Sequence, residues 1–391
     1  MKPSNAEDIA AGDKTAIKPP ILITDDAGLQ GFLEAAWRAP IIGVDTESNS
    51  LFAYYHQICL IQVSLPHADY VIDPLAVDVN PLGALFADPG CEKIFHAAEN
   101  DILGFKRDYG FDFANLFDTM IAARILGWEH AGLAGILKQH FGVALDKRLQ
   151  RTNWGQRPLR AEQLAYAQLD TYYLLPLRER QVQELQARGR WDEAQESFER
   201  LPTLEWSEKP FDDDGFWRIN GARHLGPKEL AVLKEIYLYR EHQAQQRNRP
   251  PFKVLDQRVM MAISRRQPQS IRALRRIKGM SADQTRRYGD GIVSAVKRGL
   301  KAAPPEPPRR TSGNGRPDPA TLSRYEALRN WRTERARQRG VDPDIVLTND
   351  QLMVIARRAP SSEEELLGTQ VLGTWKLTEY GQDILHLLAD A

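Results

Sequence analysis

The stretch IIGVDTES, residues 41–48, decides the fold expected for the N-terminal half of the chain. Four apolar or glycine residues lead to Asp45, which is the pattern of a buried strand with a polar end. Because alternate side chains of a strand point to the same face, Asp45 and Glu47 are predicted to lie together. Two such carboxylates are costly to bury unless a cation neutralises them. The stretch therefore predicts a site for a hard divalent ion, Mg²⁺ or Mn²⁺ rather than zinc.

The sequence around this stretch predicts a mixed α/β sheet with flanking helices. No helical stretch separates residues 41–48 from the next two strand-like runs, so these three are expected to form an antiparallel meander. Later runs alternate with helical stretches, and only helical spacing follows Asp118. The other strand-like runs are PILIT (20–24), ICLIQVSL (58–65), DYVID (69–73) and KIFHAA (93–98).

The composition is that of a protein with more than one packed core. The chain has 391 residues, of which 42% are hydrophobic. It has no apolar run near the roughly 20 residues that a membrane-spanning helix needs, and its N-terminus, MKPSNAEDIAAGDK, lacks the apolar centre of a signal peptide. Only Cys59 and Cys91 are available for thiolate chemistry. We therefore expect a cytoplasmic protein without a membrane partner.

The net charge of zero conceals a strong asymmetry along the chain. Residues 1–222 hold 21 Lys and Arg against 33 Asp and Glu, whereas residues 223–301 hold 19 against 6. Residues 302–391 are balanced, with 12 against 13. Since clustered Lys and Arg attract phosphate backbones, nucleic acid is the expected partner of the basic segment.

The C-terminal half repeats itself at a fixed offset of 92 residues, which predicts two copies of one small helical domain. A Pro-rich stretch, residues 304–319, separates the copies as a semi-stiff spacer. The matching pairs include Arg240 and Arg332, Val254 and Val346, Leu255 and Leu347, Met261 and Met353, Ile263 and Ile355, Arg265 and Arg357, Arg266 and Arg358, Pro268 and Pro360, Tyr288 and Tyr380, and Ile292 and Ile384.

These patterns predict a chain of six parts. The linkers are expected where proline and charged or small residues replace the apolar periodicity. The parts are a tail (1–20), an α/β domain (21–200), a linker (201–222), a first helical domain (223–302), a Pro-rich linker (303–320) and a second helical domain (321–391).

Three further residues are candidates to join Asp45 and Glu47. Asp101 follows the run KIFHAA and opens a helix, where α/β folds place functional residues, although an acid there also suits the helix dipole. Asp170 follows Tyr166 by four residues, so on a helix a phenol and a carboxylate share one face. A half-buried tyrosine beside an ordinary helix acid gives the same spacing. The prediction rests on all five residues together.

The order Asp45-x-Glu47, His96-Ala-Ala-Glu-Asn-Asp101 and Tyr166-Ala-Gln-Leu-Asp170 resembles the three exonuclease motifs of the DEDD nucleases, with tyrosine in the third motif. The resemblance implies a ribonuclease H-like fold. It is closer still to the ribonuclease D family, which shares the segment LDKRLQRTNWGQRPL (145–159) and two C-terminal HRDC-type helical domains. It covers roughly residues 21–391 and implies a metal-dependent 3′ to 5′ exoribonuclease that releases nucleoside 5′-monophosphates and trims tRNA precursors.

Four carboxylates, those of Asp45, Glu47, Asp101 and Asp170, suit the chemistry that this resemblance implies. They can hold two divalent cations, Mg²⁺ or Mn²⁺, about 3.5 to 4 Å apart, which stabilise the attacking and the leaving oxygen of a phosphoryl displacement. The role that the resemblance implies for Tyr166 is to hold the attacking water by a hydrogen bond.

Two regions of the α/β domain are candidate RNA contacts. The loop before the third motif carries four cations around Trp154, which suits phosphate contact with base stacking as well as it suits a solvated loop. The residues just after Glu47 are candidates to cradle the terminal nucleotide. The candidates are Lys147, Arg148, Arg151, Trp154 and Arg157 in the first region, and Ser48, Asn49, Leu51 and Phe52 in the second.

The first helical domain carries more positive charge than an ordinary solvated helix face, and a phosphate-binding role is favoured. The second domain lacks this excess and is expected to position substrate or to pack against the nuclease domain. The basic residues of the first domain are Arg265, Arg266, Arg272, Arg275, Arg276, Lys278, Arg286 and Arg287.

Three other polar residues receive structural interpretations. Asp118 is expected to cap a helix that starts at Thr119, and Asp73 to form a turn. His96 is interpreted as a core histidine at a strand end in preference to a group near the metals.

Two alternative functions stay open at this point. A DNA exonuclease of the same superfamily would use the same four acids, and only contacts to the 2′-hydroxyl separate the two substrates. A nucleic-acid-binding adaptor would use the nuclease fold as a scaffold. The partner expected is RNA, with no obligate protein partner and a monomeric chain.

Overall fold

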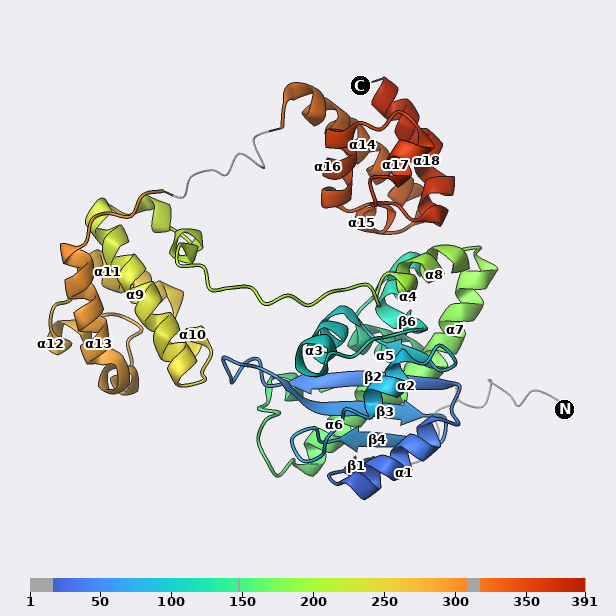
Figure 1. The fold of residues 1–391 in the computed structure, drawn as a ribbon, viewed down its shortest axis with the longest axis horizontal. Helices are drawn as coiled ribbons and strands as arrows, with labels where there is room; N and C mark the ends of the chain where they lie inside the picture. Colours follow the sequence, from blue (N-terminus) through green and yellow to red (C-terminus); the bar gives the residue numbers. More distant parts are fainter. Residues whose placement is uncertain (1–16, 147, 308–316, 391) are drawn as a thin grey trace. The chain divides into compact units, whose positions relative to one another are not determined.

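The computed structural model describes residues 17–146, 148–307 and 317–390. These residues form two compact units (Figure 1). The first unit holds residues 17–47, 58–206 and 317–390, and the second holds residues 48–57 and 207–307. None of the helices in these ranges combines the length and the apolar character that a membrane-spanning helix requires. Of the predicted tail and Pro-rich linker, residues 1–16 and 308–316 lie outside the described residues.

A mixed six-stranded sheet forms the base of the first unit, as predicted. The strand β2, which carries Asp45 and Glu47, lies between β3 and β5 in the middle of the sheet. The pair β3 and β4 is antiparallel, with Ile61 opposite Ile72, whereas β1 with β4, β2 with β5, and β5 with β6 are parallel. The sheet order is β1 (Ile21–Ile23), β4 (Ala68–Ile72), β3 (Ile58–Leu65), β2 (Ile41–Ser48), β5 (Glu92–Phe95) and β6 (Leu116–Asp118).

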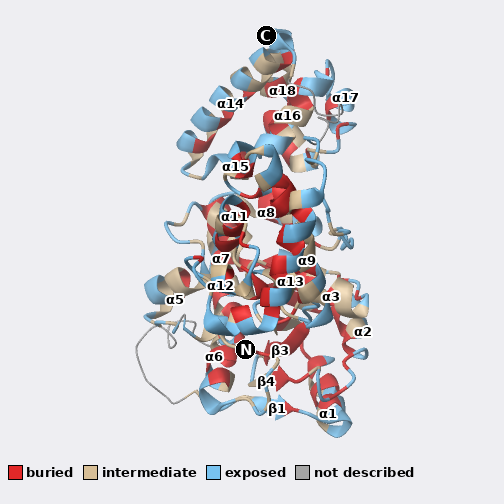
Figure 2. Cartoon of the chain, turned by 90° about the vertical axis from the view of Figure 1, so that its left-hand side faces the viewer, coloured by how far each residue is buried: buried red, intermediate tan, exposed pale blue. Residues whose placement is uncertain are grey.

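Helices cover both faces of this sheet because its strands are apolar on both sides. On one face Ile61 and Val63 belong to a cluster with Phe32 of α1 and Phe105 of α3. On the other face Leu60 packs with side chains of α6. Figure 2 shows the buried positions on the strands and on the inward sides of the helices. The helices are α1 (Asp26–Ala36), α2 (Leu82–Ala87), α3 (Glu99–Tyr109), α4 (Thr119–Leu126), α5 (Leu133–Phe141), α6 (Ala161–Tyr172), α7 (Leu174–Ala187) and α8 (Trp191–Glu199), with a short 3-10 helix at Leu149–Arg151.

The two helical domains have the same fold, and this confirms the predicted repeat. Each helix of the second domain begins 92 residues after its counterpart in the first. At the end of the third helix Gln267 and Ala359 both have positive φ, at 47° and 43°, so the repeat extends to the backbone. The first domain has α9 (Pro227–Gln246), α10 (Pro251–Val254), α11 (Gln257–Arg266), α12 (Ile271–Leu274) and α13 (Ala282–Lys301), and the second has α14 (Pro319–Arg339), α15 (Pro343–Val346), α16 (Asn349–Arg358), α17 (Glu363–Leu367) and α18 (Thr374–Ala389).

The segment before α9 differs from the linker that the sequence predicts for residues 201–222. Phe216 and Trp217 lie in a 3-10 helix (Gly215–Arg218) and are buried in the core of the first helical domain. Their large apolar surface is most stable in that core. The packed part of this domain therefore includes residues before 223.

The second helical domain packs against the nuclease domain within the first unit. The guanidinium of Arg339 forms an ion pair with Glu193 of α8, which is 1% exposed. The backbone N–H of Trp375 donates to Glu196 of α8 over 2.6 Å. Arg124 of α4 pairs with Asp344 over 2.7 Å. Of the two roles expected for this domain, the structure therefore has the packing one.

Candidate active site

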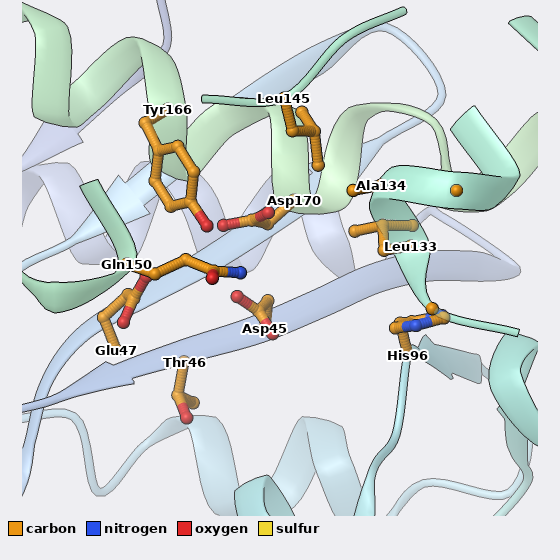
Figure 3. Close-up of a pocket in the computed structure, with 12 residues that line it drawn as sticks. Asp45, Thr46, Glu47, His96, Leu133, Ala134, Leu145, Gln150, Tyr166 and Asp170 are labelled. Carbon is orange, nitrogen blue, oxygen red and sulfur yellow. The ribbon is translucent and has the colours of Figure 1, made fainter. Parts of the chain in front are cut away.

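A cleft of about 470 Å³ opens at the end of β2. Its walls come from β2, from His96 after β5, from the N-terminal part of α5, from Leu145 and Gln150, and from α6. Figure 3 shows the hydroxyl of Tyr166 and the carboxylate of Asp170, both from α6, pointing toward each other near Asp45 of β2. The lining residues are Asp45, Thr46, Glu47, His96, Gly132, Leu133, Ala134, Gly135, Leu145, Gln150, Tyr166 and Asp170.

The strand β2 brings Asp45 and Glu47 into this cleft together, as the alternation of its side chains predicts. Burial raises the pKa of Asp45 well above its usual value, and the nearby carboxylates of Asp101 and Asp170 raise it further. Burial, followed by the charges of Asp170 and Asp101, raises the pKa of Glu47 to about 9. Both shifts have one meaning, since negative charge at this strand end is unfavourable without a compensating cation.

The helix α6 supplies Tyr166 and Asp170 from adjacent turns. Burial raises the pKa of Asp170 to about 7, while a hydrogen bond from the Tyr166 hydroxyl stabilises the carboxylate. A glycine lets the helix approach the sheet, because a Cβ at Gly43 would lie 3.1 Å from the carbonyl oxygen of Thr171. The spacing of four residues therefore delivers the phenol and the carboxylate to one point beside β2.

Asp101 occupies a different position from the other three acids. It lies in the first turn of α3 and accepts a hydrogen bond from the hydroxyl of Thr46. It does not line the cleft, although its charge acts on both Asp45 and Glu47. Burial raises its pKa to about 7. In the described part of the chain, no three acidic, histidine or cysteine side chains are arranged as a metal-binding cluster. The structure thus brings together Asp45, Glu47, Tyr166 and Asp170, with Asp101 turned to Thr46.

His96 and Asp118 both follow or end a strand, but only His96 lines the cleft, whereas Asp118 caps a helix. His96 lines the cleft, which corrects its interpretation as a core residue. Its Nδ1 lies 2.9 Å from the hydroxyl oxygen of Thr119, and burial lowers its pKa to about 4, so the ring is neutral. Asp118 caps α4 as predicted, since it accepts hydrogen bonds from the N–H groups of Met120 and Ile121.

Gln150 is a cleft residue that residue-by-residue reasoning missed. Its side chain is hydrogen-bonded to Tyr166, and Figure 3 places it between Glu47 and Tyr166. Nothing in the spacing of Gln150 marks it as functional. It does lie within the segment 145–159 that supported the family resemblance, and this was the available signal.

The loop before α6 corrects one predicted RNA contact. Trp154 is 0% exposed, and its ring lies 6.1 Å from the ring of Tyr166 in a cluster with Cys59 and Leu60. A base cannot stack on a side chain that is enclosed in this way, so Trp154 supports Tyr166 by packing. Arg157 is also structural, because it pairs with Asp73 and donates to the carbonyl of Cys59 over 2.7 Å.

The other predicted contacts of this domain are differently placed. Arg148 pairs with Asp146 at the surface, and Arg151 is exposed, whereas Lys147 lies outside the described residues. Asp73 also forms the predicted turn, since its side chain accepts from the N–H of Leu75 over 3.0 Å. RNA contact by Arg148 and Arg151 stays a prediction.

The residues after Glu47 belong to the second unit. The side chain of Asn49 accepts a hydrogen bond from the N–H of Gln57 over 2.9 Å, which closes the loop 48–57. Leu51 is 41% exposed, and Ser48 lies at the end of β2. Contact of Ser48, Asn49 and Leu51 with a nucleotide stays a prediction.

The basic residues of the first helical domain form an exposed surface. Arg286 and Arg287 share Asp283 as a partner. In the part of the chain that the structure describes, the other six have no acidic side chain within 4.0 Å. These six are Arg265, Arg266, Arg272, Arg275, Arg276 and Lys278.

The chain matches two family models. Residues 20–186 match a 3′-5′ exonuclease domain, and residues 229–296 and 321–388 each match an HRDC domain. Ribonuclease D of Gluconacetobacter diazotrophicus is 30% identical over 385 residues, which cover 97% of this chain and 95% of that protein. The chain belongs to the ribonuclease D family.

Other members of the ribonuclease D family agree with this result. Ribonuclease D of Pseudomonas paraeruginosa is 30% identical over 377 residues, covering 94% of this chain and 97% of that protein. The crystal structure of Escherichia coli RNase D, described as an exoribonuclease involved in structured RNA processing, matches with a TM-score of 0.65 and 25% identity. It covers 95% of this chain and 99% of that one. This chain is therefore a 3′-5′ exoribonuclease of the ribonuclease D type, and the exonuclease domains of this family generally depend on divalent metal ions.

Proposed function

We propose that this exoribonuclease removes nucleoside 5′-monophosphates from RNA 3′ ends at the cleft of β2 and α6. Asp45, Glu47, Asp101 and Asp170 are the proposed metal ligands, and Tyr166 is the proposed water-orienting residue. One observation carries the proposal. Three carboxylates, those of Asp45, Glu47 and Asp170, line one cleft at the end of a central strand, and these three and the neighbouring Asp101 all have raised pKa values.

The chemistry of these donors fits two divalent cations, Mg²⁺ or Mn²⁺. Every proposed ligand atom is a carboxylate oxygen, which hard divalent ions prefer. Among the described residues, no lysine or arginine contributes to the pKa of Glu47 or Asp170. When bound, the cations supply Lewis-acid activation of water and neutralise the charge that develops on the departing 3′ oxygen.

The protein side chains orient the reactants. Tyr166 donates to Asp170 and is itself hydrogen-bonded to Gln150, so its hydroxyl is held at a defined place in the cleft. From that place the hydroxyl can hold a water in line with the scissile phosphate. Trp154 packs against the ring of Tyr166 and restricts its movement. Asp101, which accepts a hydrogen bond from Thr46, would join this ligand set if its carboxylate bound a cation in place of that hydroxyl.

The proposed substrates are tRNA precursors with 3′ extensions. Support comes from the family relationship and from the exposed arginines of the first helical domain, which suit the phosphates of a folded RNA. Arg265, Arg266, Arg275 and Arg276 are the proposed contacts. The chain is proposed to act as a monomer.

The test is to incubate the protein and Mg²⁺ with a 5′-labelled precursor tRNA that carries a 3′ tail, and to resolve products at single-nucleotide intervals. We expect a ladder that shortens from the 3′ end and nucleoside 5′-monophosphates in the supernatant. A matched DNA oligonucleotide is expected to be shortened much more slowly. Equal rates on the two would favour the DNA exonuclease alternative, and internal cuts would contradict the proposal.

A further inference from the structure

The segment 48–57, called the loop 48–57, starts at the last residue of β2 and leads to β3, yet it belongs to the compact unit of the first helical domain. Its sequence, SNSLFAYYHQ, contains three aromatic residues. Neither the fold of the sheet nor the proposed chemistry accounts for them. Their contacts suggest what they do.

The backbone of this loop is held by one side chain at the end of α9. The Oδ1 atom of Asn248 accepts hydrogen bonds from the N–H of Tyr54 over 3.0 Å and from the N–H of Tyr55 over 2.9 Å. Asn248 has a positive φ of 45°, a conformation that asparagine adopts more readily than most residues. The side chain thus replaces the strand partner that these two N–H groups lack.

Side chains of the loop are held by the same edge of the helical domain. The hydroxyl of Tyr54 donates to Glu241, which is buried, and accepts from the side-chain amide of Gln245 over 3.1 Å. The ammonium of Lys253 lies 3.6 Å from the centre of the Phe52 ring. Backbone and side chains are therefore fixed independently.

These contacts leave two large apolar side chains open. Tyr55 is 63% exposed and Leu51 is 41% exposed, while Ala53 between them is buried. An exposed aromatic ring suits base stacking, which tolerates any sequence. The loop begins at the residue after Glu47, so its placement and that of the strand end are linked by one peptide bond.

We propose that Asn248 is a positioning residue, which holds the loop 48–57 so that Tyr55 stacks on a base near the RNA 3′ end. This inference rests on the proposed function, because it assigns a contact to the RNA that the cleft is proposed to shorten. The equivalent position of the second helical domain is Gly340, which has no acceptor side chain. We call the two hydrogen bonds from Tyr54 and Tyr55 to Asn248 the clamp. The clamp is therefore a feature of the first domain and not of the second.

The test compares Asn248→Gly with Asn248→Asp in the full chain. Glycine keeps the positive φ and copies Gly340, but removes the acceptor, whereas aspartate keeps an acceptor oxygen of the same shape. In Asn248→Gly the amides of Tyr54 and Tyr55 should exchange with solvent about tenfold faster, because each loses its hydrogen bond. The kcat on single-stranded RNA should fall about tenfold with KM changed less than about twofold, because the arginines remain and only alignment is lost. In Asn248→Asp both the amide exchange rates and kcat should stay close to those of the wild type.

Other outcomes would overturn the inference. Unchanged amide exchange in Asn248→Gly contradicts the clamp, and faster exchange with unchanged kcat contradicts the positioning role. A parallel variant, Tyr55→Leu, should lower kcat to a similar extent without changing exchange at Tyr54, and wild-type kcat in this variant contradicts the stacking role. Amide exchange is measured without substrate, so the clamp is tested even if the protein fails to shorten RNA.

Discussion

The two helical domains share a backbone but differ in what their surfaces contact. In both, an arginine at the C-terminal end of the first helix contacts a tyrosine of the last helix. In the first domain Arg247 lies over the ring of Tyr288 at 5.3 Å. In the second, 92 residues on, Arg339 bonds to the hydroxyl of Tyr380 and also pairs with Glu193 of the nuclease domain. Because Glu193 lies on the nuclease domain, the arginine that makes only an internal contact in the first domain also makes an interdomain contact in the second.

The charged surfaces differ in the same sense. Within the residues that the structure describes, six exposed cations of the first domain have no acidic side chain nearby, whereas the second domain has balanced charge and is fixed to α4 and α8. A shared core therefore says little about function, because function depends on the few side chains at the surface. We infer that the first domain grips RNA and that the second is a structural part of the nuclease.

The largest effect is expected from a variant that impairs catalysis but leaves RNA binding intact. Asp170→Asn should lower kcat/KM on RNA by about a thousandfold or more, because a ligand of the proposed cations loses its charge. RNA affinity, measured by fluorescence anisotropy, should stay within about twofold, since the basic residues of the first helical domain are untouched. Tyr166→Phe should also lower the rate severely. If Asp170→Asn cleaves at the wild-type rate, the ligand assignment is wrong.

The second effect tests the attachment of the second helical domain. Glu193→Gln should lower the free energy of unfolding by about 3 kcal/mol, because it leaves the largely buried Arg339 without its charged partner. The matched control is Glu235→Gln in the first domain, which breaks the more exposed pair with Arg298 and should cost less than about 1 kcal/mol. Urea denaturation measures both. Equal losses would mean that the pair of Glu193 with Arg339 stabilises the protein no more than an exposed pair within one domain.

The third effect tests which domain grips RNA. Replacing Arg265, Arg266, Arg275 and Arg276 by glutamine should weaken binding about 30-fold and lower the salt dependence by about 0.7 for each phosphate that the protein no longer neutralises. The exact counterparts of the first two are Arg357 and Arg358 of the second domain. Replacing that pair should change affinity by less than about twofold. A loss of affinity from the Arg357 and Arg358 variant as large as that from the four-arginine variant would contradict the division of roles.

The smallest effect compares the paired tyrosines. The hydroxyl of Tyr288 is buried without a hydrogen-bond partner among the described residues, whereas that of Tyr380 bonds to Arg339. Tyr380→Phe should therefore cost about 1 kcal/mol of unfolding free energy, and Tyr288→Phe should be close to neutral. Thermal denaturation of the two variants is the measurement. A larger cost for Tyr288→Phe would remove this difference between the domains.

Local sequence patterns were sufficient for the features that depend on one element. Alternation along β2 predicts the common face of Asp45 and Glu47, and a spacing of four on α6 predicts the pairing of Tyr166 with Asp170. The 92-residue offset predicts both helical domains. Each of these follows from the period of a strand, a helix or a repeat.

Features that depend on packing between elements were not accessible in this way. Trp154 has mostly polar neighbours in the sequence, yet its side chain is enclosed by residues of β3, β4 and α6. Asp101 turns toward Thr46, and His96 reaches the cleft, because of how β2, β5 and α3 come together. The prolines and acids of residues 201–222 likewise predict a linker, although Phe216 and Trp217 are buried in the core of the first helical domain.

The most direct test of the account is chelation followed by metal return, with a 5′-labelled RNA resolved at single-nucleotide intervals. We predict that EDTA stops shortening completely, that RNA binding largely survives, and that excess Mg²⁺ restores a ladder descending from the 3′ end. Undiminished shortening in EDTA would contradict hydrolysis by cations held on Asp45, Glu47, Asp101 and Asp170.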